Sequence, residues 1–598
     1  MGYRAPVEDV SFFLKTCTAL PALMEQGLVE LSFDVVDPVL EEAAKFAQAV
    51  IEPLDKVADK EHCRLKDGVV TTPTGWREAY EAWAGAGWGG VGAEEEFGGQ
   101  NLPTTITSAL TEFWNSASPA FALGGVLTSG AIEALTVHGS AELQKTYLEK
   151  MVAGQWMGTM NLTEPQAGSD LAALRAKAVP HGDGTYRIFG TKIFISYGEH
   201  DVADNIVHLV LARLPDAPPG TRGISLFVVP KFLVNADGSL GARNDVYATG
   251  LEHKLGLHGS PTCTMSFGDG GEGAIGWIIG EENKGLACMF TMMNNARLAV
   301  GVQGVAVAER ATQRAFAYAK DRRQGKAQGY NGEGMAPIVF HPDVKRMLLT
   351  MRAETDAARV ICLMTADALD RARRSADPMA RSAALAEAGL LTPVAKAFSS
   401  DTGITVSSIG VQVHGGMGYV EETGAAQHYR DARIFAIYEG TNGIQAIDLV
   451  ARKLPQEGGD VVNALIADYR DIADAAGALN APDFGQMGER LGEAVDALAR
   501  ATRRMLDWLP EEPAKALAGA TPYLKLFARA AGGAYLVKAA IAAHAARGAG
   551  ETDPRHAARI AVARFFAEDL CPEARGLEAT VEHGAAAVLD AEAVLALD

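Results

Sequence analysis

The chain has 598 residues, of which 48% are hydrophobic and 21% charged, and this ordinary globular composition excludes a disordered or fibrous protein. A chain of this length is expected to form several domains rather than one. Its net charge of −20 argues against nucleic acid or anionic lipid as the main partner.

The spacing of apolar residues predicts helices towards both ends of the chain and strands between them. The β-type runs are short and closely spaced, which favours a small barrel or sandwich over βαβ units. The predicted fold is therefore multidomain α and β, with a central β-barrel or sandwich, a C-terminal four-helix bundle and further helices beyond a linker at 454–460. The expected parts are an N-terminal extension (1–35), a helical N-terminal domain (36–158), a β-domain (159–282), a helical bundle (283–453) and an extra helical domain (460–598).

The cysteine pattern and the apolar runs bear on the cellular setting. Six cysteines are scattered without CxxC pairs or metal-ligand spacing, which indicates reduced thiols and no metal site. The N-terminus shows no signal pattern, and no uninterrupted apolar run approaches about 18 residues. We therefore expect a cytoplasmic protein with no membrane segment.

Two segments near the helix-to-strand transition carry groups that a ligand could use. Met160-Asn-Leu-Thr-Glu-Pro-Gln-Ala-Gly-Ser-Asp170 offers hydroxyls and a glycine that permits close approach to the backbone, although Thr-Glu-Pro is also a common turn. Gly190-Thr-Lys-Ile-Phe-Ile-Ser-Tyr-Gly198 sets Phe194 and Ser196 on one face of a strand, where they suit the edge of a planar ring. An ordinary amphipathic strand would look the same, so neither motif decides alone.

Two further segments follow predicted bundle helices. Gln412-Val-His-Gly-Gly-Met-Gly-Tyr419 suits packing against a phosphate or ribose, but it is not a GxGxxG after a strand, and His414 is expected to be structural. Arg430-Asp-Ala-Arg433 precedes Ile437-Tyr-Glu-Gly-Thr-Asn-Gly443. In the latter segment, Glu439 is either a solvated helix cap or a base held in a dry pocket.

The order and spacing of the four motifs remove this ambiguity. Together they strongly resemble the acyl-CoA dehydrogenase family, over about residues 35–453. The resemblance implies an enzyme that binds FAD non-covalently and oxidises an acyl-CoA thioester to a trans-2-enoyl-CoA. The extra C-terminal domain, the N-terminal extension and the segment Lys254-Leu-Gly-Leu-His-Gly-Ser-Pro-Thr262 resemble the long bacterial subgroup of the family. We therefore expect 3-methylmercaptopropionyl-CoA or another short or medium acyl-CoA as the substrate.

The resemblance also implies roles for single positions. Glu439 matches the catalytic base, which removes the α-proton while a hydride passes to flavin N5. Gln412 and Gly416 match a segment that reaches the FAD of a neighbouring subunit. The substrate is expected to contact Ser169, Arg297, Tyr438 and Gly440. The positions expected to bind FAD are Met160, Leu162, Thr163, Gly168, Ser169, Phe194, Ser196, Arg322, Gln412, Gly416 and Thr441.

Two details depart from the commonest family pattern. Phe194 stands where the family usually has tryptophan, which keeps an aromatic face but loses an indole N–H. Gln324-Gly325 replaces Phe-Gly, and a glycine-rich loop at Gly329–Met335 follows it, so the FAD contacts of this stretch are expected to differ.

The resemblance implies electron-transferring flavoprotein as the electron acceptor and a homo-oligomer, with a dimer favoured. Four alternatives remain at this level: a medium- or long-chain dehydrogenase of β-oxidation, an acyl-CoA oxidase, a DNA-binding alkylation-response flavoprotein and a non-catalytic interaction protein. The acidic net charge disfavours DNA binding, and the intact Glu439 disfavours a non-catalytic role.

Overall fold

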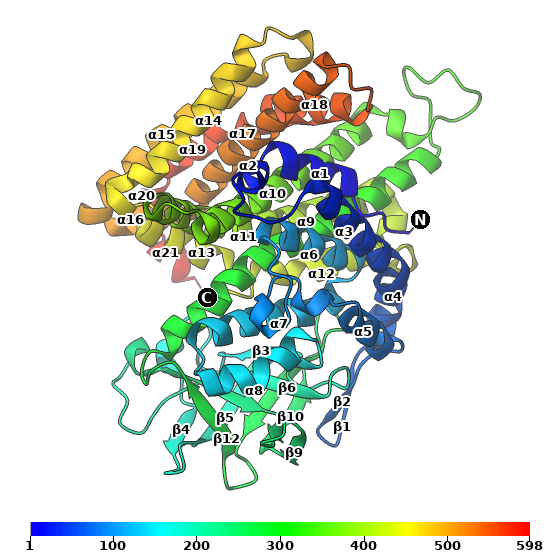
Figure 1. Ribbon diagram of the computed structural model, residues 1–598. Helices are drawn as coiled ribbons and strands as arrows, with labels where there is room; N and C mark the ends of the chain where they lie inside the picture. Colours follow the sequence, from blue (N-terminus) through cyan, green and yellow to red (C-terminus); the bar gives the residue numbers. More distant parts are fainter. Residues whose placement is uncertain (1, 598) are drawn as a thin grey trace.

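The computed structural model describes residues 2–597, which form a helical N-terminal region, a central region of strands, a bundle of long helices and a last helical region (Figure 1). The strands gather at one end of the molecule, the last helices of the chain lie at the opposite end, and the long bundle helices run between them. Most buried apolar side chains form a single continuous cluster that extends through all four regions. The six cysteines are free, and five of them are buried.

The N-terminal region is helical, with one strand hairpin that the sequence analysis did not predict. Strands β1 and β2 pair through a two-residue turn at Asp67-Gly68, whose φ values of 51° and 75° are both left-handed. Asp-Gly is a strong signal for such a turn, so the hairpin could have been predicted. The elements are α1 (Val7–Thr16), α2 (Leu20–Glu25), α3 (Phe33–Phe46), α4 (Glu52–Glu61), β1 (Arg64–Lys66), β2 (Val69–Thr71), α5 (Trp76–Gly85), α6 (Thr104–Ala117), α7 (Pro119–His138) and α8 (Ala141–Val152).

The central region is a mixed eight-stranded sheet with the strand order β10-β11-β5-β12-β7-β6-β3, to which β4 adds by pairing with β5. Apart from the parallel pair β3 and β6, neighbouring strands in this sheet are antiparallel. Strands β8 and β9 form a separate hairpin. The strands are β3 (Trp156–Asn161), β4 (Lys177–Pro180), β5 (Tyr186–Ser196), β6 (Asn205–Ala212), β7 (Ser225–Pro230), β8 (Phe232–Val234), β9 (Leu240–Arg243), β10 (Val246–Leu251), β11 (Thr262–Phe267) and β12 (Ala274–Ile279).

The bundle is built on three long helices, α9 (Gly285–Asp321), α10 (Pro342–Arg374) and α11 (Pro378–His414). Two contacts show that helices α9 and α11 run in the same direction. Gly304 packs on Ser399 near the middle of both helices, and the Tyr318 and His414 rings stack 4.3 Å apart near the two C-terminal ends. A Cβ on Gly304 would lie 2.2 Å from the Ser399 carbonyl oxygen, so this approach requires glycine. The shorter helices α12 (Ala425–Ala432) and α13 (Asn442–Asp448) follow.

The last region is helical, and the N-terminal extension packs on it. The Lys538 ammonium donates to the Cys17 carbonyl at 2.7 Å, and Arg559 pairs with Asp9 at 2.7 Å while lying 4.0 Å from the centre of the Phe12 ring. The expected linker at 454–460 is a short turn that begins at a buried leucine. The helices are α14 (Asp460–Ala478), α15 (Met487–Glu511), α16 (Pro513–Ala518), α17 (Ala520–Gly548), α18 (Arg555–Phe565), α19 (Glu573–His583), α20 (Ala585–Leu589) and α21 (Glu592–Leu595).

Helices α7 and α17 are long and apolar enough to cross a membrane by length and composition, although neither is an uninterrupted apolar run. Within the fold, 61% of the apolar window of α7 and 83% of that of α17 are buried. Core helices of this kind pass the same test, so the burial explains their composition.

Candidate active site

Glu439 lies in a short loop, which we call the base loop (residues 438–442), between α12 and α13. The backbone of Glu439 is left-handed, with φ of 56°, and Gly440 follows with φ of 85°. A left-handed glutamate costs about 1–3 kcal/mol and persists only where its surroundings impose it. Such strain is concentrated at functional sites, which makes this loop the first candidate.

The hydrogen bonds of the base loop engage its carbonyl groups and leave Glu439 itself free. Gln445 Nε2 donates to the carbonyls of Glu439 and Gly440, both at 3.2 Å, and Lys396 Nζ donates to the Gly440 carbonyl at 2.8 Å. Within residues 2–597, no protein group hydrogen-bonds to the backbone N–H or to the carboxylate of Glu439. Both groups are therefore available to a ligand.

The surroundings of Glu439 tune it towards a base that works near neutral pH. Burial raises the pKa of its carboxyl to about 7, although the charges of Arg297 and Lys396 oppose the shift. A general base is most effective when its pKa lies near the working pH. The geometry and the pKa thus support the same role.

Arg297 comes from α9 and is nearly buried beside the base loop. Its Nη1 donates to Asp448 at 3.1 Å, and the position of a Cβ on Gly440 would lie 4.0 Å from its Nη2. Its Nε is buried without a hydrogen-bond partner in the described part of the chain. A buried guanidinium with an unused donor is the kind of group that a bound anion or carbonyl would complete.

Thr441, rather than Glu439, caps the helix that follows. The Thr441 hydroxyl accepts a hydrogen bond from the backbone N–H of Ile444 at 3.3 Å at the start of α13. The cap interpretation of Glu439 is therefore wrong. The expected contact of Thr441 with FAD stays a prediction, since its hydroxyl still has a proton to donate.

The first two motifs are joined at the ends of β3 and β5. The backbone N–H of Ile193 donates to the Thr163 carbonyl at 2.9 Å, and Lys192 Nζ donates to the Leu162 carbonyl at 2.9 Å. Lys192 also pairs with Glu164 at 2.8 Å, and both side chains are buried. The Thr-Glu-Pro motif is thus held rigidly against the strand that carries Phe194.

Phe194 is held out of the core. Its φ of 59° is left-handed, it lies where the pairing of β5 and β11 is irregular, and its side chain is 59% exposed. Nearby, Gly168 and Ser169 are exposed, and a Cβ on Gly168 would meet nothing within 4 Å. An exposed ring beside exposed polar groups is an open platform for a planar ligand.

This platform is connected to the base loop through the segment 252–261. The backbone N–H of Tyr197 donates to the Pro261 carbonyl at 2.7 Å, and that of Leu257 donates to Asp431 in α12 at 2.6 Å. Helix α12 in turn leads into the base loop. The first, second and fourth motifs therefore belong to one connected region.

The remaining predicted FAD positions lie elsewhere. Arg322 ends α9, and Gln412 and Gly416 lie at the matching end of α11; all three are exposed. Arg297 and Arg322 are separated by roughly 37 Å along α9, at about 1.5 Å per residue. Arg322, Gln412 and Gly416 therefore lie far from the Arg297 end of α9 and from the base loop of the same chain.

The two groups of residues fit FAD. The exposed Phe194 ring, the polar backbone around Thr163 and the hydroxyl of Ser196 suit the flavin ring. A guanidinium at Arg322 and the backbone at Gly416, where a Cβ would meet nothing within 4 Å, suit phosphate and sugar. No described group of three or more His, Cys, Asp or Glu side chains could hold a metal ion.

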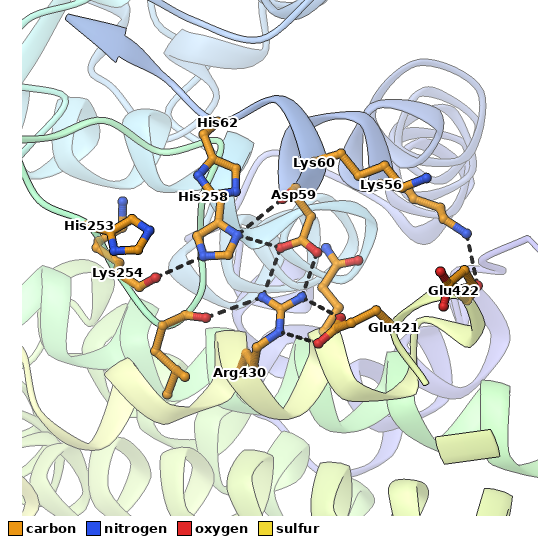
Figure 2. Close-up of a pocket in the computed structure, with 12 residues that line it drawn as sticks. Lys56, Asp59, Lys60, His62, His253, Lys254, His258, Glu421, Glu422 and Arg430 are labelled. Atoms are coloured by element: carbon orange, nitrogen blue, oxygen red, sulfur yellow. Dashed lines mark hydrogen bonds and ion pairs between the residues drawn. The ribbon is translucent and has the colours of Figure 1, made fainter. Parts of the chain in front are cut away.

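A cavity of about 470 Å³ lies where α4, the segment 253–258 and α12 meet, and none of the predicted site residues is among those that line it (Figure 2). Arg430 binds Asp59 through both terminal nitrogens, at 2.9 and 2.6 Å, and His258 contacts the same carboxylate at 2.9 Å. Although burial opposes ionisation, these partners hold the pKa of Asp59 below its ordinary value and raise that of His258. The charges satisfy one another, so this cluster holds three parts of the chain together.

The chain is similar to known proteins over nearly all of its length. Family models match in order: the acyl-CoA dehydrogenase N-terminal domain at 37–155, middle domain at 159–269 and C-terminal domain at 283–454, followed by an acetyl-CoA dehydrogenase C-terminal-like domain at 462–592. A 3-methylmercaptopropionyl-CoA dehydrogenase of Ruegeria pomeroyi is 44% identical over 96% of this chain and 97% of its own length. The chain belongs to the acyl-CoA dehydrogenase family.

Other relatives agree with this assignment. A butyryl-CoA dehydrogenase of Syntrophomonas wolfei is 33% identical over 96% of this chain and 95% of its own length. An acyl-CoA dehydrogenase of Bacillus anthracis, solved in complex with FAD, is 21% identical and superposes with a TM-score of 0.71. The match covers 92% of this chain and 88% of the Bacillus chain, so the two share a fold. The protein is thus an FAD-dependent oxidoreductase of this family that acts on the CH–CH bond of an acyl-CoA.

The sequence analysis missed two buried lysines in this acyl-CoA dehydrogenase site. Lys192 and Lys396 are both fully buried, the first against Glu164 and the second against the base loop. Lys192 lies within the second motif and Lys396 in the apolar stretch 390–398, and a lysine with apolar neighbours is a signal that could have identified both.

Proposed function

We propose that the protein dehydrogenates a short or medium acyl-CoA, 3-methylmercaptopropionyl-CoA among them, to the trans-2-enoyl-CoA, with Glu439 as the base. The observation that carries this proposal is the base loop, in which a strained glutamate with a pKa of about 7 keeps its carboxylate and N–H free. The identity of 44% to a 3-methylmercaptopropionyl-CoA dehydrogenase supports the thioether substrate.

In this mechanism the Glu439 carboxylate removes the α-proton of the thioester. The backbone N–H of Glu439 donates to the thioester oxygen and stabilises the charge that develops there. Arg297 stabilises that charge from α9, and Tyr438, Gly440 and Ser169 border the acyl-CoA. Bound FAD supplies the acceptor for the hydride that leaves the β-carbon.

The FAD contacts divide between the platform and the far end of the bundle. The backbone at Met160 and Leu162, together with Thr163, Phe194 and Ser196, would hold the flavin side, and Gly168, Ser169 and Thr441 would lie towards the phosphates. Arg322, Gln412 and Gly416 hold the phosphate and adenosine side of a second subunit's FAD. Exposed apolar side chains beside Gly416, with Tyr419 at 89% and Met417 at 49%, support coverage of this end by a second copy.

Anaerobic reduction of the bound flavin by three substrates tests the chain-length preference. We expect 3-methylmercaptopropionyl-CoA and butyryl-CoA to bleach the flavin at similar rates, because a sulfur and a methylene fill a pocket almost equally. Octanoyl-CoA should be slower by about tenfold if the pocket is short. Bleaching by octanoyl-CoA alone would contradict the proposed substrate, while leaving the assignment of Glu439 intact.

Mixed dimers test whether two chains share each FAD site. Arg322→Ala should weaken FAD binding by about 10- to 100-fold, since it removes a charge-assisted contact. When Arg322→Ala and Glu439→Gln chains are mixed and exchanged, each mixed dimer has one site with both native residues. Activity should therefore recover to about one quarter of the wild-type value after random exchange.

The control is each variant exchanged with itself, which should recover nothing. Mass analysis verifies that the chains have exchanged. If the mixture is then no more active than the average of the two single variants, Arg322 and Glu439 of one chain belong to the same site. Sedimentation of the wild type checks the favoured dimer against a tetramer.

We also propose electron-transferring flavoprotein as the acceptor. A dehydrogenase should turn over with this protein and slowly in air, whereas an acyl-CoA oxidase would release hydrogen peroxide in air at the full rate. Peroxide measured against acyl-CoA consumed separates the two.

A further inference from the structure

Lys396 lies in the middle of α11, is fully buried and ends at the base loop. Its Nζ donates to the Gly440 carbonyl at 2.8 Å and to Asn442 Oδ1 at 2.9 Å. Asn442 is fixed in turn, because its Nδ2 donates to Asp401 Oδ1 at 2.8 Å and to Ser400 Oγ at 3.0 Å. The lysine thus bonds to both residues that flank Thr441 and, through Gly440, to the peptide next to Glu439.

A packing role does not account for this lysine. A methionine would fill similar space without the cost of burying an ammonium group. The other fully buried lysine, Lys192, has a carboxylate partner at 2.8 Å, whereas none of the described carboxylates lies within 4.0 Å of Lys396 Nζ. Its charge therefore has no direct ion pair.

The charged groups that face Lys396 come from three elements. Glu439 faces it from the base loop, Asp401 from its own helix and Arg297 from α9. Burial lowers the pKa of Lys396 to about 7, and the two carboxylates oppose that shift. Asp401 already accepts a hydrogen bond from Asn442, so Glu439 is the carboxylate whose ionisation the ammonium favours most directly.

We propose that Lys396 is a positioning residue for the reaction: it holds the base loop through Gly440 and Asn442, and its charge sets the pH range in which Glu439 acts as a base. The inference rests on the proposed role of Glu439. The hydrogen bonds from Lys396 hold the left-handed turn at Glu439 and Gly440 in place. This turn sets the direction in which the Glu439 carboxylate points. The charge favours the carboxylate over the carboxylic acid, so its loss moves the acid limb of the pH–rate profile to higher pH.

Two substitutions separate these contributions. Lys396→Met removes both the donor and the charge, whereas Lys396→Gln keeps a donor without the charge. We expect Lys396→Met to lower kcat by about 10²-fold, as a misplaced catalytic group does. Both variants should shift the acid limb of kcat upwards by about one pH unit. Lys396→Gln should have a higher kcat than Lys396→Met, but the acid limb of its pH–rate profile should be shifted by the same amount.

Lys538→Met is the matched control, because it also removes a lysine that donates to a backbone carbonyl, at Cys17 and far from Glu439. It should lower thermal stability without moving the pH profile. A wild-type acid limb in Lys396→Met, with only thermal stability reduced, would overturn the proposal. If Lys396→Met does not fold, as judged by FAD content, the limb of Lys396→Gln decides: a shift supports the proposal and an unshifted limb overturns it.

The proposed function fails independently of this inference. Wild-type enzyme that no acyl-CoA reduces, or full activity in Glu439→Gln, would remove the role of Glu439 itself. If acyl-CoA reduces the flavin of the wild type but substitutions of Lys396 leave the acid limb of the pH–rate profile unchanged, only the positioning role of Lys396 is removed.

Discussion

Glu439→Gln is expected to lower the rate of flavin reduction by acyl-CoA by about 10³-fold, the range of a lost general base, while FAD stays bound. In the wild type, the rate should rise with pH through about 7 as the Glu439 carboxyl ionises. The measurement is stopped-flow flavin absorbance under anaerobic conditions, at several pH values.

The matched control is Glu457→Gln. Glu457 is also a left-handed glutamate, with φ of 51°, but it is exposed in the turn that precedes α14. Its replacement should leave the rate unchanged. Undiminished reduction in Glu439→Gln would mean that the base has been wrongly assigned.

The Glu439→Gln substitution should also change the stability of the folded protein. The folded pKa of Glu439 lies above its ordinary value of 4.5, so ionisation costs the folded state free energy as pH rises from about 4.5 through 7. Glu439→Gln removes that cost and should raise the free energy of unfolding by about 1–2 kcal/mol above pH 7, with little gain near pH 4. Thermal unfolding at the two pH values checks the sign.

Arg359→Met is expected to give the largest loss of stability, about 3–5 kcal/mol at pH 7. Arg359 is fully buried in α10, where it binds Glu112 of α6 at 2.8 Å and Glu309 of α9 at 2.6 Å and also contacts Asp356. Without the guanidinium, these buried carboxylates lose a shared partner. Thermal unfolding and FAD retention measure the effect.

The loss should depend on pH with a defined sign. The carboxylates left behind in Arg359→Met would have raised pKa values, so the destabilisation should be greatest at pH 7–8 and should shrink near pH 5. Arg346→Met is the control on the same helix, because Arg346 forms an exposed pair with Asp343 that is worth less than about 1 kcal/mol. Equal unfolding temperatures for both variants would contradict a stabilising role for the cluster.

The sequence motifs predicted the chemistry of this protein more completely than they predicted the contacts between its residues. Glu439 and Thr163 could be selected because they are polar residues in segments whose glycines permit close approach of a ligand, and Phe194 because it shares a strand face with Ser196; the order of their motifs then matched a family. The left-handed conformation of Glu439 could not be predicted, since it depends on Gln445 and Lys396, which come from different helices. Gln445 has the sequence context of an ordinary helical position and Lys396 is marked only by its apolar neighbours, so neither pattern indicates a contact with the base loop.

The resemblance assigned Gln412 and Gly416 to a neighbouring subunit's FAD, but nothing in the sequence indicated that Arg322 lies with them. Arg322 and Gln412 are 90 positions apart but lie at one end of the bundle, because α9 and α11 run in the same direction. Glu164 illustrates the opposite case. Its motif was selected for the neighbouring hydroxyl, whereas the carboxylate itself binds Lys192 and the backbone N–H groups of Arg175 and Ala176.

The contact between α1 and the helices α17 and α18 has a consequence for biosynthesis. About 500 residues separate the two partners, so at roughly 5–20 residues per second the first helix waits about 25–100 s for its docking surface. During that time the ring of Phe12, which lies against Arg559 and His556 of α18 in the finished protein, lacks those contacts. The N-terminal segment therefore cannot complete its packing until the final helices have emerged from the ribosome.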